Sequence, residues 1–138
     1  MRVEIYSRKR IEKLPDGKFP AHTAVISFFD PDRCQTDKSC APVDYRGKTE
    51  RVLYVPLDDF QAALPEAKSI AEFVKCAKED GWNVICQCES GQTRSAGCAA
   101  AILQYFYGKG YTVLENDAYF PDQMVYEKVL EALEECSF

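Results

Sequence analysis

The sequence predicts one α/β domain with a mostly parallel central sheet of about four to five strands and helices on both faces. Segments with the pattern of strands alternate with segments that have the pattern of helices, and the 138 residues match the size of one ordinary domain. Several of the strand segments are nearly continuous in apolar residues, which is typical of parallel strands that are covered on both faces. We therefore interpret residues 1–138 as a single domain.

Four segments have the pattern of strands. Residues 3–6 form a short β-prone start, and residues 23–29 (TAVISFF) form an almost unbroken apolar run that Asp30-Pro31 ends. Residues 51–56 (RVLYVP) and 82–86 (WNVIC) are the other two. These segments supply the predicted sheet.

Helices are predicted between and after these strands. Ser7 is a suitable N-cap for a short helix that reaches Leu14, and apolar residues recur at helical spacing between Pro65 and Gly81. Residues 95–107 are small and apolar enough for a largely buried helix, and a last helix begins at Pro121. Residues 31–50 are polar and are predicted to be one long surface loop, while residues 108–120 are predicted to be irregular.

Composition excludes several classes of function. The net charge of −5 and the pI near 4.9 disfavour a nucleic-acid binder, and no apolar run is long enough to span a membrane. The N-terminus lacks the pattern of a secretion signal, so we expect a cytoplasmic protein, and we expect a monomer. The seven cysteines, an odd number, are then reduced thiols. His22 is the only histidine and the cysteine spacings match no common zinc site, so we expect no metal and no cofactor.

One segment carries a chemical signature, and it lies between the predicted strand 82–86 and the predicted helix 95–107. It runs from Cys88 to Ser95 and has the pattern C-x2-G-x2-R-S. A strand, a short turn and a helix in that order direct successive backbone N–H groups inward and form an anion cradle. Gly91 lets the backbone curl, and Arg94 can clamp two phosphate oxygens with its planar fork of donors. The residues expected to bind the phosphate are Glu89, Ser90, Gly91, Gln92, Thr93 and Arg94.

The same surroundings make Cys88 a candidate nucleophile. A thiol at a helix N-terminus beside an arginine has its pKa lowered, so Cys88 is expected to be a thiolate at neutral pH. Attack on phosphorus would form a cysteinyl-phosphate, and the Ser95 hydroxyl can bond the thiolate and help it leave in the second step.

The Cys88 segment resembles the signature of the cysteine-based protein tyrosine phosphatase superfamily, in its compact dual-specificity-phosphatase-like branch of bacterial type. The resemblance implies a general acid about 30 residues upstream, and Asp58 and Asp59 lie 30 and 29 residues before Cys88. The run Val55-Pro56-Leu57-Asp58-Asp59 resembles the family's apolar-Pro-apolar-x-Asp segment, which maps Asp59 onto the acid and leaves Asp58 as the alternative. The final helix also resembles the C-terminal helix of small bacterial members.

The implied function is hydrolysis of phosphomonoesters, in a phosphorylated protein or in a small molecule such as a phosphoinositide or a nucleotide. The chain departs from the family at Gln87, where a histidine is usual, because an amide supplies hydrogen bonds but no charge. A phosphate-binding pseudophosphatase that recognises phosphorylated partners is therefore one alternative. Another C-x5-R enzyme, an arsenate reductase or a sulfurtransferase, is a second, and Cys86 is its nearest resolving thiol.

Two further features have structural interpretations. Cys86 lies two residues before Cys88 and could trap it as a disulfide after oxidation, although a place in the core is the simpler interpretation. The basic run from Ser7 to Arg10 is interpreted as the solvated face of a short helix rather than as an attractor of anionic substrates.

Overall fold

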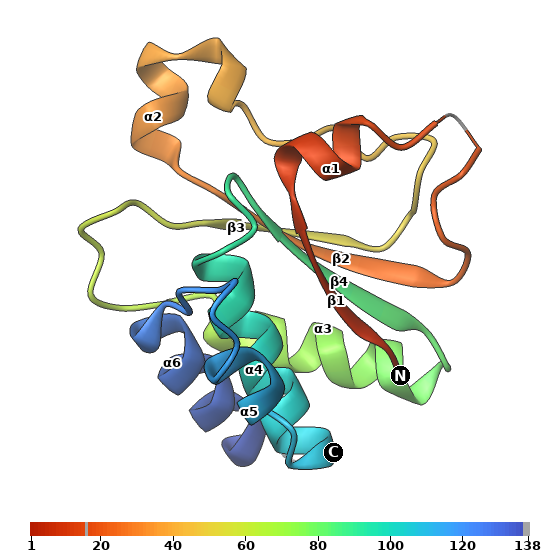
Figure 1. Ribbon diagram of the computed structural model, residues 1–138, viewed down its shortest axis with the longest axis vertical. Coiled ribbons are helices and arrows are strands. Elements are labelled where there is room, and N and C mark those ends of the chain that lie inside the picture. Colours follow the sequence, from red (N-terminus) through yellow and green to blue (C-terminus); the bar gives the residue numbers. More distant parts are fainter. Residues whose placement is uncertain (16, 137–138) are drawn as a thin grey trace.

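The computed structural model describes residues 1–15 and 17–136, and within them it contains a four-stranded sheet in which all neighbouring strands are parallel (Figure 1). The strands are β1 (Val3–Ser7), β2 (Thr23–Phe29), β3 (Val52–Pro56) and β4 (Asn83–Cys88), in the spatial order β1-β4-β2-β3. The last strand of the sequence therefore lies between β1 and β2. The predicted α/β domain with a parallel sheet is confirmed.

The pairing register places the carboxyl ends of the strands at one edge of the sheet. Ser7 pairs with Cys88, and Phe29 pairs with Pro56. The segments that follow β2, β3 and β4 consequently leave the sheet side by side. This edge is where open parallel sheets bind ligands.

Helices α3 (Ala67–Glu79), α4 (Arg94–Tyr107), α5 (Tyr111–Leu114) and α6 (Gln123–Glu135) lie on one side of the sheet (Figure 1). Helix α4 is buried from Ser95 to Ile102 because its residues there are small or apolar. Gly97 allows the segment before α6 to approach, since a Cβ at this position would lie 2.5 Å from the backbone oxygen of Asp122. This face holds the larger part of the hydrophobic core.

The other face of the sheet is covered more thinly, by helix α1 (Arg8–Glu12) and by the irregular segment 41–50 (Figure 1). Ile11 of α1 and Tyr45 of the segment pack there against Val25 and Ile85 of the sheet. Helices therefore lie on both faces, as predicted, but one face has only a helix of five residues among those described.

The polar stretch 31–50 is not one loop, and the prediction is wrong there. It contains helix α2 (Pro31–Thr36) and the 3-10 helix η1 (Lys38–Cys40). Helix α2 begins because Asp30 is its N-cap, accepting hydrogen bonds from the N–H groups of Asp32 and Arg33, with Pro31 as the first residue.

Smaller differences concern the bounds of elements. Strand β4 continues to Cys88 instead of ending at residue 86, and α1 ends at Glu12 rather than at Leu14. Helix α5 lies within the stretch 108–120 that was predicted to be irregular. None of the described helices combines the length and apolar character needed to cross a membrane.

Candidate active site

The segment Cys88–Ser95, the Cys88 loop, joins the end of β4 to the first turn of α4. Gly91 at its centre has a φ of +69°, which L side chains rarely adopt. A Cβ on Gly91 would also lie 2.7 Å from the backbone nitrogen of Ser7 and 2.9 Å from its Cα. The loop can therefore curl tightly against the end of β1 because this residue is a glycine.

The sulfur of Cys88 lies at the centre of this curl and is almost fully buried, with the residue 3% exposed. The Ser95 hydroxyl oxygen is 3.0 Å from the sulfur, and the backbone N–H of Gly91 donates to it over 3.3 Å. The Ser90 hydroxyl lies at 4.0 Å. The Ser95 hydroxyl and the Gly91 N–H of the loop therefore both contact the Cys88 sulfur.

Two opposing effects act on the pKa of Cys88. Burial raises this pKa, but hydrogen bonds from the Ser95 hydroxyl and from the backbone N–H groups of Ser95, Thr93 and Gly91 outweigh burial. The pKa of Cys88 consequently lies below the ordinary value for a thiol. The site therefore stabilises a thiolate through neutral donors rather than through a neighbouring histidine.

Arg94, near the end of the Cys88 loop, directs its guanidinium at two carboxylates. Its Nη2 is 2.5 Å from Oδ1 of Asp59 and 3.7 Å from Oδ2 of Asp30, and its side chain is 15% exposed. Asp58 has a different role, because its Oδ1 accepts a hydrogen bond from the N–H of Phe60 and caps a turn. Of the two candidate acids, Asp59 is the one that contacts the predicted phosphate clamp.

A cavity of about 230 Å³ opens beside Arg94, between the segment after β3 and the start of α6. Its lining residues are Leu57, Asp58, Asp59, Gln61, Thr93, Arg94, Asp122 and Met124. Arg94 also lines a smaller cavity of about 30 Å³, together with Asp30, Arg33, Cys40 and Glu89 among others. The guanidinium is therefore accessible from a concave surface, as a ligand clamp must be.

Gln87, the residue that departs from the resembled family, is buried next to the loop. Its Oε1 accepts hydrogen bonds from the Ser27 hydroxyl over 2.5 Å and from the Tyr45 hydroxyl over 2.7 Å. Successive residues of a strand point to opposite faces, so Gln87 and Cys88 face different sides of the sheet. The hydrogen bonds of Gln87 thus link β4 to β2 and to the segment 41–50, on the face of the sheet opposite to Cys88.

Cys86 lies in β4, two residues before the Cys88 loop, and is completely buried. A hydrogen bond with Cys98 and burial together raise the pKa of Cys86 well above that of an ordinary thiol. The hydrogen-bonding partner of Cys86 is therefore Cys98 of α4 rather than Cys88. A core position, the simpler of the two interpretations from the sequence, agrees with this environment.

Sequence reasoning missed two residues at the site, Asp30 and Arg8. Asp30 caps α2 with Oδ1 and turns Oδ2 toward Arg94. The prediction that Arg8 lies on a solvated face is wrong, because its side chain is only 14% exposed and pairs with Glu89 of the Cys88 loop. A signal for Asp30 was available, since an Asp-Pro pair is a typical start of a helix.

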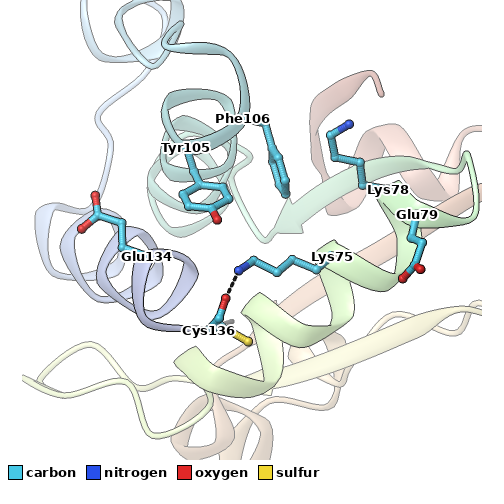
Figure 2. Close-up of a pocket in the computed structure, with 7 residues that line it drawn as sticks. All are labelled: Lys75, Lys78, Glu79, Tyr105, Phe106, Glu134 and Cys136. Atoms are coloured by element: carbon cyan, nitrogen blue, oxygen red, sulfur yellow. Dashed lines mark hydrogen bonds between the residues drawn. The ribbon is translucent and has the colours of Figure 1, made fainter. Parts of the chain in front are cut away.

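A larger cavity of about 570 Å³ lies away from this site, at the end of α4 and between α3 and α6 (Figure 2). Its lining residues are Lys75, Lys78, Glu79, Tyr105, Phe106, Glu134 and Cys136. Lys75 donates there to the backbone oxygens of Leu133 and Cys136. This cavity contains none of the residues predicted to carry chemistry, so size alone does not make it the candidate active site.

Comparisons with known proteins agree with the fold. No protein-family model and no curated protein sequence matches the chain. Among solved structures, human DUSP28 is similar with a TM-score of 0.65 and 14% identity, over 96% of this chain and 88% of that one. Tk-PTP in its active form gives 0.61 and 16% over 99% and 94%, and PTPMT1 in complex with PI(5)P gives 0.62 and 11% over 97% and 91%. The chain therefore has the compact dual-specificity-phosphatase-like fold that the sequence resemblance implies.

Proposed function

We propose that this protein is a cysteine-dependent phosphatase that hydrolyses phosphomonoesters, with phosphotyrosine or phosphoserine and phosphothreonine of proteins as its substrates. The observation that carries the proposal is the environment of Cys88. Its buried sulfur is hydrogen-bonded by the Ser95 hydroxyl and by loop N–H groups that lower its pKa, and Arg94 belongs to the same loop. A nucleophile and an anion clamp are thereby combined in one loop.

In the first step, the Cys88 thiolate attacks phosphorus and a sulfur–phosphorus bond forms while the bond to the leaving oxygen breaks. The loop N–H groups and Arg94 neutralise charge on the three remaining phosphate oxygens. Asp59 gives its proton to the leaving oxygen, which departs as a neutral alcohol or phenol. Because the Asp59 side chain is 65% exposed, it can move away from Arg94 when the phosphate takes its place.

In the second step, water attacks the cysteinyl-phosphate and the sulfur–phosphorus bond breaks. Asp59, now a carboxylate, accepts a proton from the water. The departing sulfur regains its hydrogen bond from the Ser95 hydroxyl, whose oxygen lies 3.0 Å from the sulfur. Inorganic phosphate leaves and the thiolate is restored.

The surroundings of Cys86 favour this reaction over arsenate reduction or sulfur transfer by a C-x5-R loop. Those reactions need a resolving thiol that can reach Cys88, and Cys86 is the nearest candidate in sequence. Cys86 is fully buried, its thiol is hydrogen-bonded to Cys98, and its pKa is raised, so it is a poor nucleophile. Since PTPMT1 is known in complex with PI(5)P, a phosphoinositide belongs among the substrates to be screened.

The test is hydrolysis of p-nitrophenyl phosphate and of phosphopeptides by the wild-type protein and by Cys88→Ser. We expect a bell-shaped pH profile in the wild type, and in Cys88→Ser no turnover but continued binding of inorganic phosphate. Cys76→Ser, which changes an exposed thiol on α3, is the matched control and should keep full activity. Full activity in Cys88→Ser would overturn the proposal, and a wild type that binds phosphate without turnover would identify a pseudophosphatase.

A further inference from the structure

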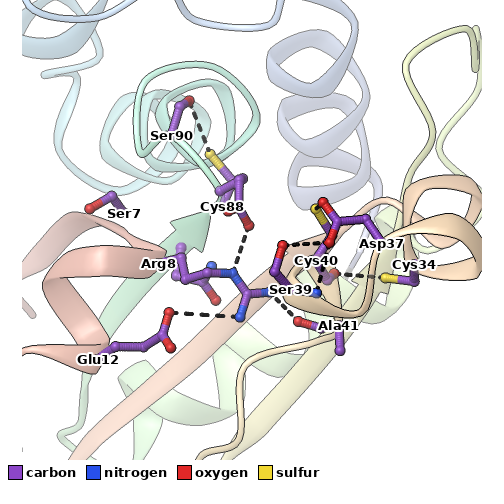
Figure 3. A network of polar contacts seen from close by, with 12 residues as sticks. Ser7, Arg8, Glu12, Cys34, Asp37, Ser39, Cys40, Ala41, Cys88 and Ser90 are labelled. Atoms are coloured by element: carbon purple, nitrogen blue, oxygen red, sulfur yellow. Dashed lines mark hydrogen bonds and ion pairs between the residues drawn. The ribbon is translucent and has the colours of Figure 1, made fainter.

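Arg8 is a basic side chain that is held inside a polar network beside the candidate active site (Figure 3). Its Nε donates to Oε2 of Glu89 over 2.7 Å, and its backbone N–H donates to the backbone oxygen of Glu89 over 3.3 Å. The rest of the guanidinium contacts the backbone oxygen of Ala41 and, at 3.8 Å, the carboxylate of Glu12. Four contacts thus fix the orientation of Arg8.

Glu89 is an unfavourable residue in an anion-binding loop, because its carboxylate is negatively charged. It follows Cys88 directly and lines the same small cavity as Arg94 and Asp30. Arg94 already faces the carboxylates of Asp30 and Asp59. A third carboxylate that was free to turn toward Arg94 would compete with the phosphate for its N–H groups and would repel the phosphate charge.

We propose that Arg8 is a positioning residue that holds the Glu89 carboxylate away from Arg94 and neutralises its charge, so that the Cys88 loop remains open to a phosphate. The inference rests on the proposed function. Its physical basis is that a largely buried guanidinium, fixed on the Ala41 oxygen, pairs with a carboxylate more firmly than an exposed lysine could. Arg8 touches neither the nucleophile nor the clamp and acts through Glu89.

The decisive experiment measures vanadate affinity by calorimetry, together with kcat and KM for p-nitrophenyl phosphate, in Arg8→Gln. We expect vanadate to bind on the order of five- to tenfold more weakly and KM to rise by a similar factor, with little change in kcat. Lys9→Gln is the matched control, because it removes the same charge from an exposed neighbour on α1. The loss in Arg8→Gln should also shrink as salt is added, because screening weakens the repulsion from Glu89.

The double variant Arg8→Gln/Glu89→Gln separates this role from simple support of the fold. With the carboxylate removed, vanadate affinity and KM should return to within about twofold of the wild type. A purely structural role predicts instead that the double variant binds vanadate no better than Arg8→Gln. Unchanged affinity in Arg8→Gln, or a lack of rescue, would overturn the inference.

A second variant keeps the inference testable if Arg8→Gln does not fold. Arg8→Lys keeps the charge but loses the planar fork that holds the Glu89 carboxylate, so vanadate should bind more weakly, by a smaller factor than in Arg8→Gln. Vanadate affinity in Arg8→Lys equal to that of the wild type would contradict the inference, because the fixed geometry of the ion pair would then not matter. A wild-type protein that binds no vanadate and hydrolyses nothing would instead refute the proposed function, so the two failures are distinguishable.

Discussion

The two loops that meet at Arg94 are held in different ways. The Cys88 loop is tied by three backbone hydrogen bonds to two neighbouring segments. The N–H groups of Arg8, Phe120 and Asp122 donate to the backbone oxygens of Glu89, Gln92 and Thr93, over 3.3, 2.8 and 3.0 Å. These contacts come from α1 and from the segment before α6. The backbone donors of the Cys88 loop are therefore fixed before any ligand arrives.

The acid loop, residues 58–63, is more loosely held. Its turn is closed by hydrogen bonds of Asp58 with Phe60 and Gln61, within the loop itself, and Phe60 is 96% exposed. Its link to the Cys88 loop is the side chain of Asp59 on Arg94. The difference indicates that charge stabilisation is preorganised, while the proton donor lies on a segment that can move when a phosphate displaces it.

The largest effect is expected when the Cys88 loop loses the guanidinium of Arg94. Arg94→Lys keeps the charge but loses the planar fork, so kcat/KM should fall on the order of 10²- to 10³-fold and vanadate affinity should fall with it. Steady-state kinetics and calorimetry measure both. Arg46→Lys, in an arginine whose side chain is 91% exposed, is the control. A variant with wild-type affinity and rate would show that Arg94 does not bind the substrate.

The acid loop is tested by Asp59→Asn. Loss of the acid should lower kcat on phosphotyrosine about 10²-fold, less on p-nitrophenyl phosphate with its better leaving group, and should flatten the basic limb of the pH profile. Vanadate should bind at least as tightly, because a carboxylate that competes for Arg94 is gone. Asp58→Asn is the matched control, and if it flattens the basic limb instead, Asp58 is the acid.

A smaller effect is expected from Ser95→Ala, which tests how the Cys88 loop lowers the pKa of its cysteine. The Ser95 hydroxyl lowers the pKa of Cys88, so its removal raises that pKa. The thiolate is the active form, and the acidic limb of the pH profile should therefore move to higher pH. The rate of alkylation of Cys88 by iodoacetamide, followed against pH by mass spectrometry, measures the shift directly. An unchanged limb would mean that Ser95 does not tune the thiolate.

The smallest effect on catalysis is expected from Gln87→His. The Gln87 side chain faces away from Cys88, and its Oε1 accepts from both Ser27 and Tyr45. A neutral imidazole accepts only one hydrogen bond, so one buried donor loses its partner and the free energy of unfolding should fall by about 1–3 kcal/mol. Urea denaturation measures this loss. An acidic limb that moves as far as in Ser95→Ala would show that residue 87 acts on the thiolate after all.

The features that were predicted from the sequence are local in the chain. The strand 23–29 follows from its unbroken apolar run, and the Cys88 loop follows from residues within one short segment between a strand and a helix. The choice of Asp59 over Asp58 came from the resemblance, and the structure places Asp59 on Arg94. Its role as the acid remains a prediction.

The features that were missed depend on the register of the sheet. Arg8 and Glu89 are 81 residues apart, and they meet because β1 pairs with β4 so that Ser7 lies beside Cys88. Asp30 meets Arg94 because β2 ends at the same edge. Helix α2 was missed for a local reason: Asp30-Pro31 was interpreted only as the end of a strand, although the pair also caps a helix.

The most direct measurement of the central claim is to trap the covalent intermediate. The protein is mixed with a phosphorylated substrate, quenched within milliseconds, digested, and examined by mass spectrometry for a phosphate bound to a cysteine. The account predicts a phosphate on Cys88, and none on Cys86 or Cys98. Turnover without a phosphocysteine, or with the phosphate on another residue, would contradict it.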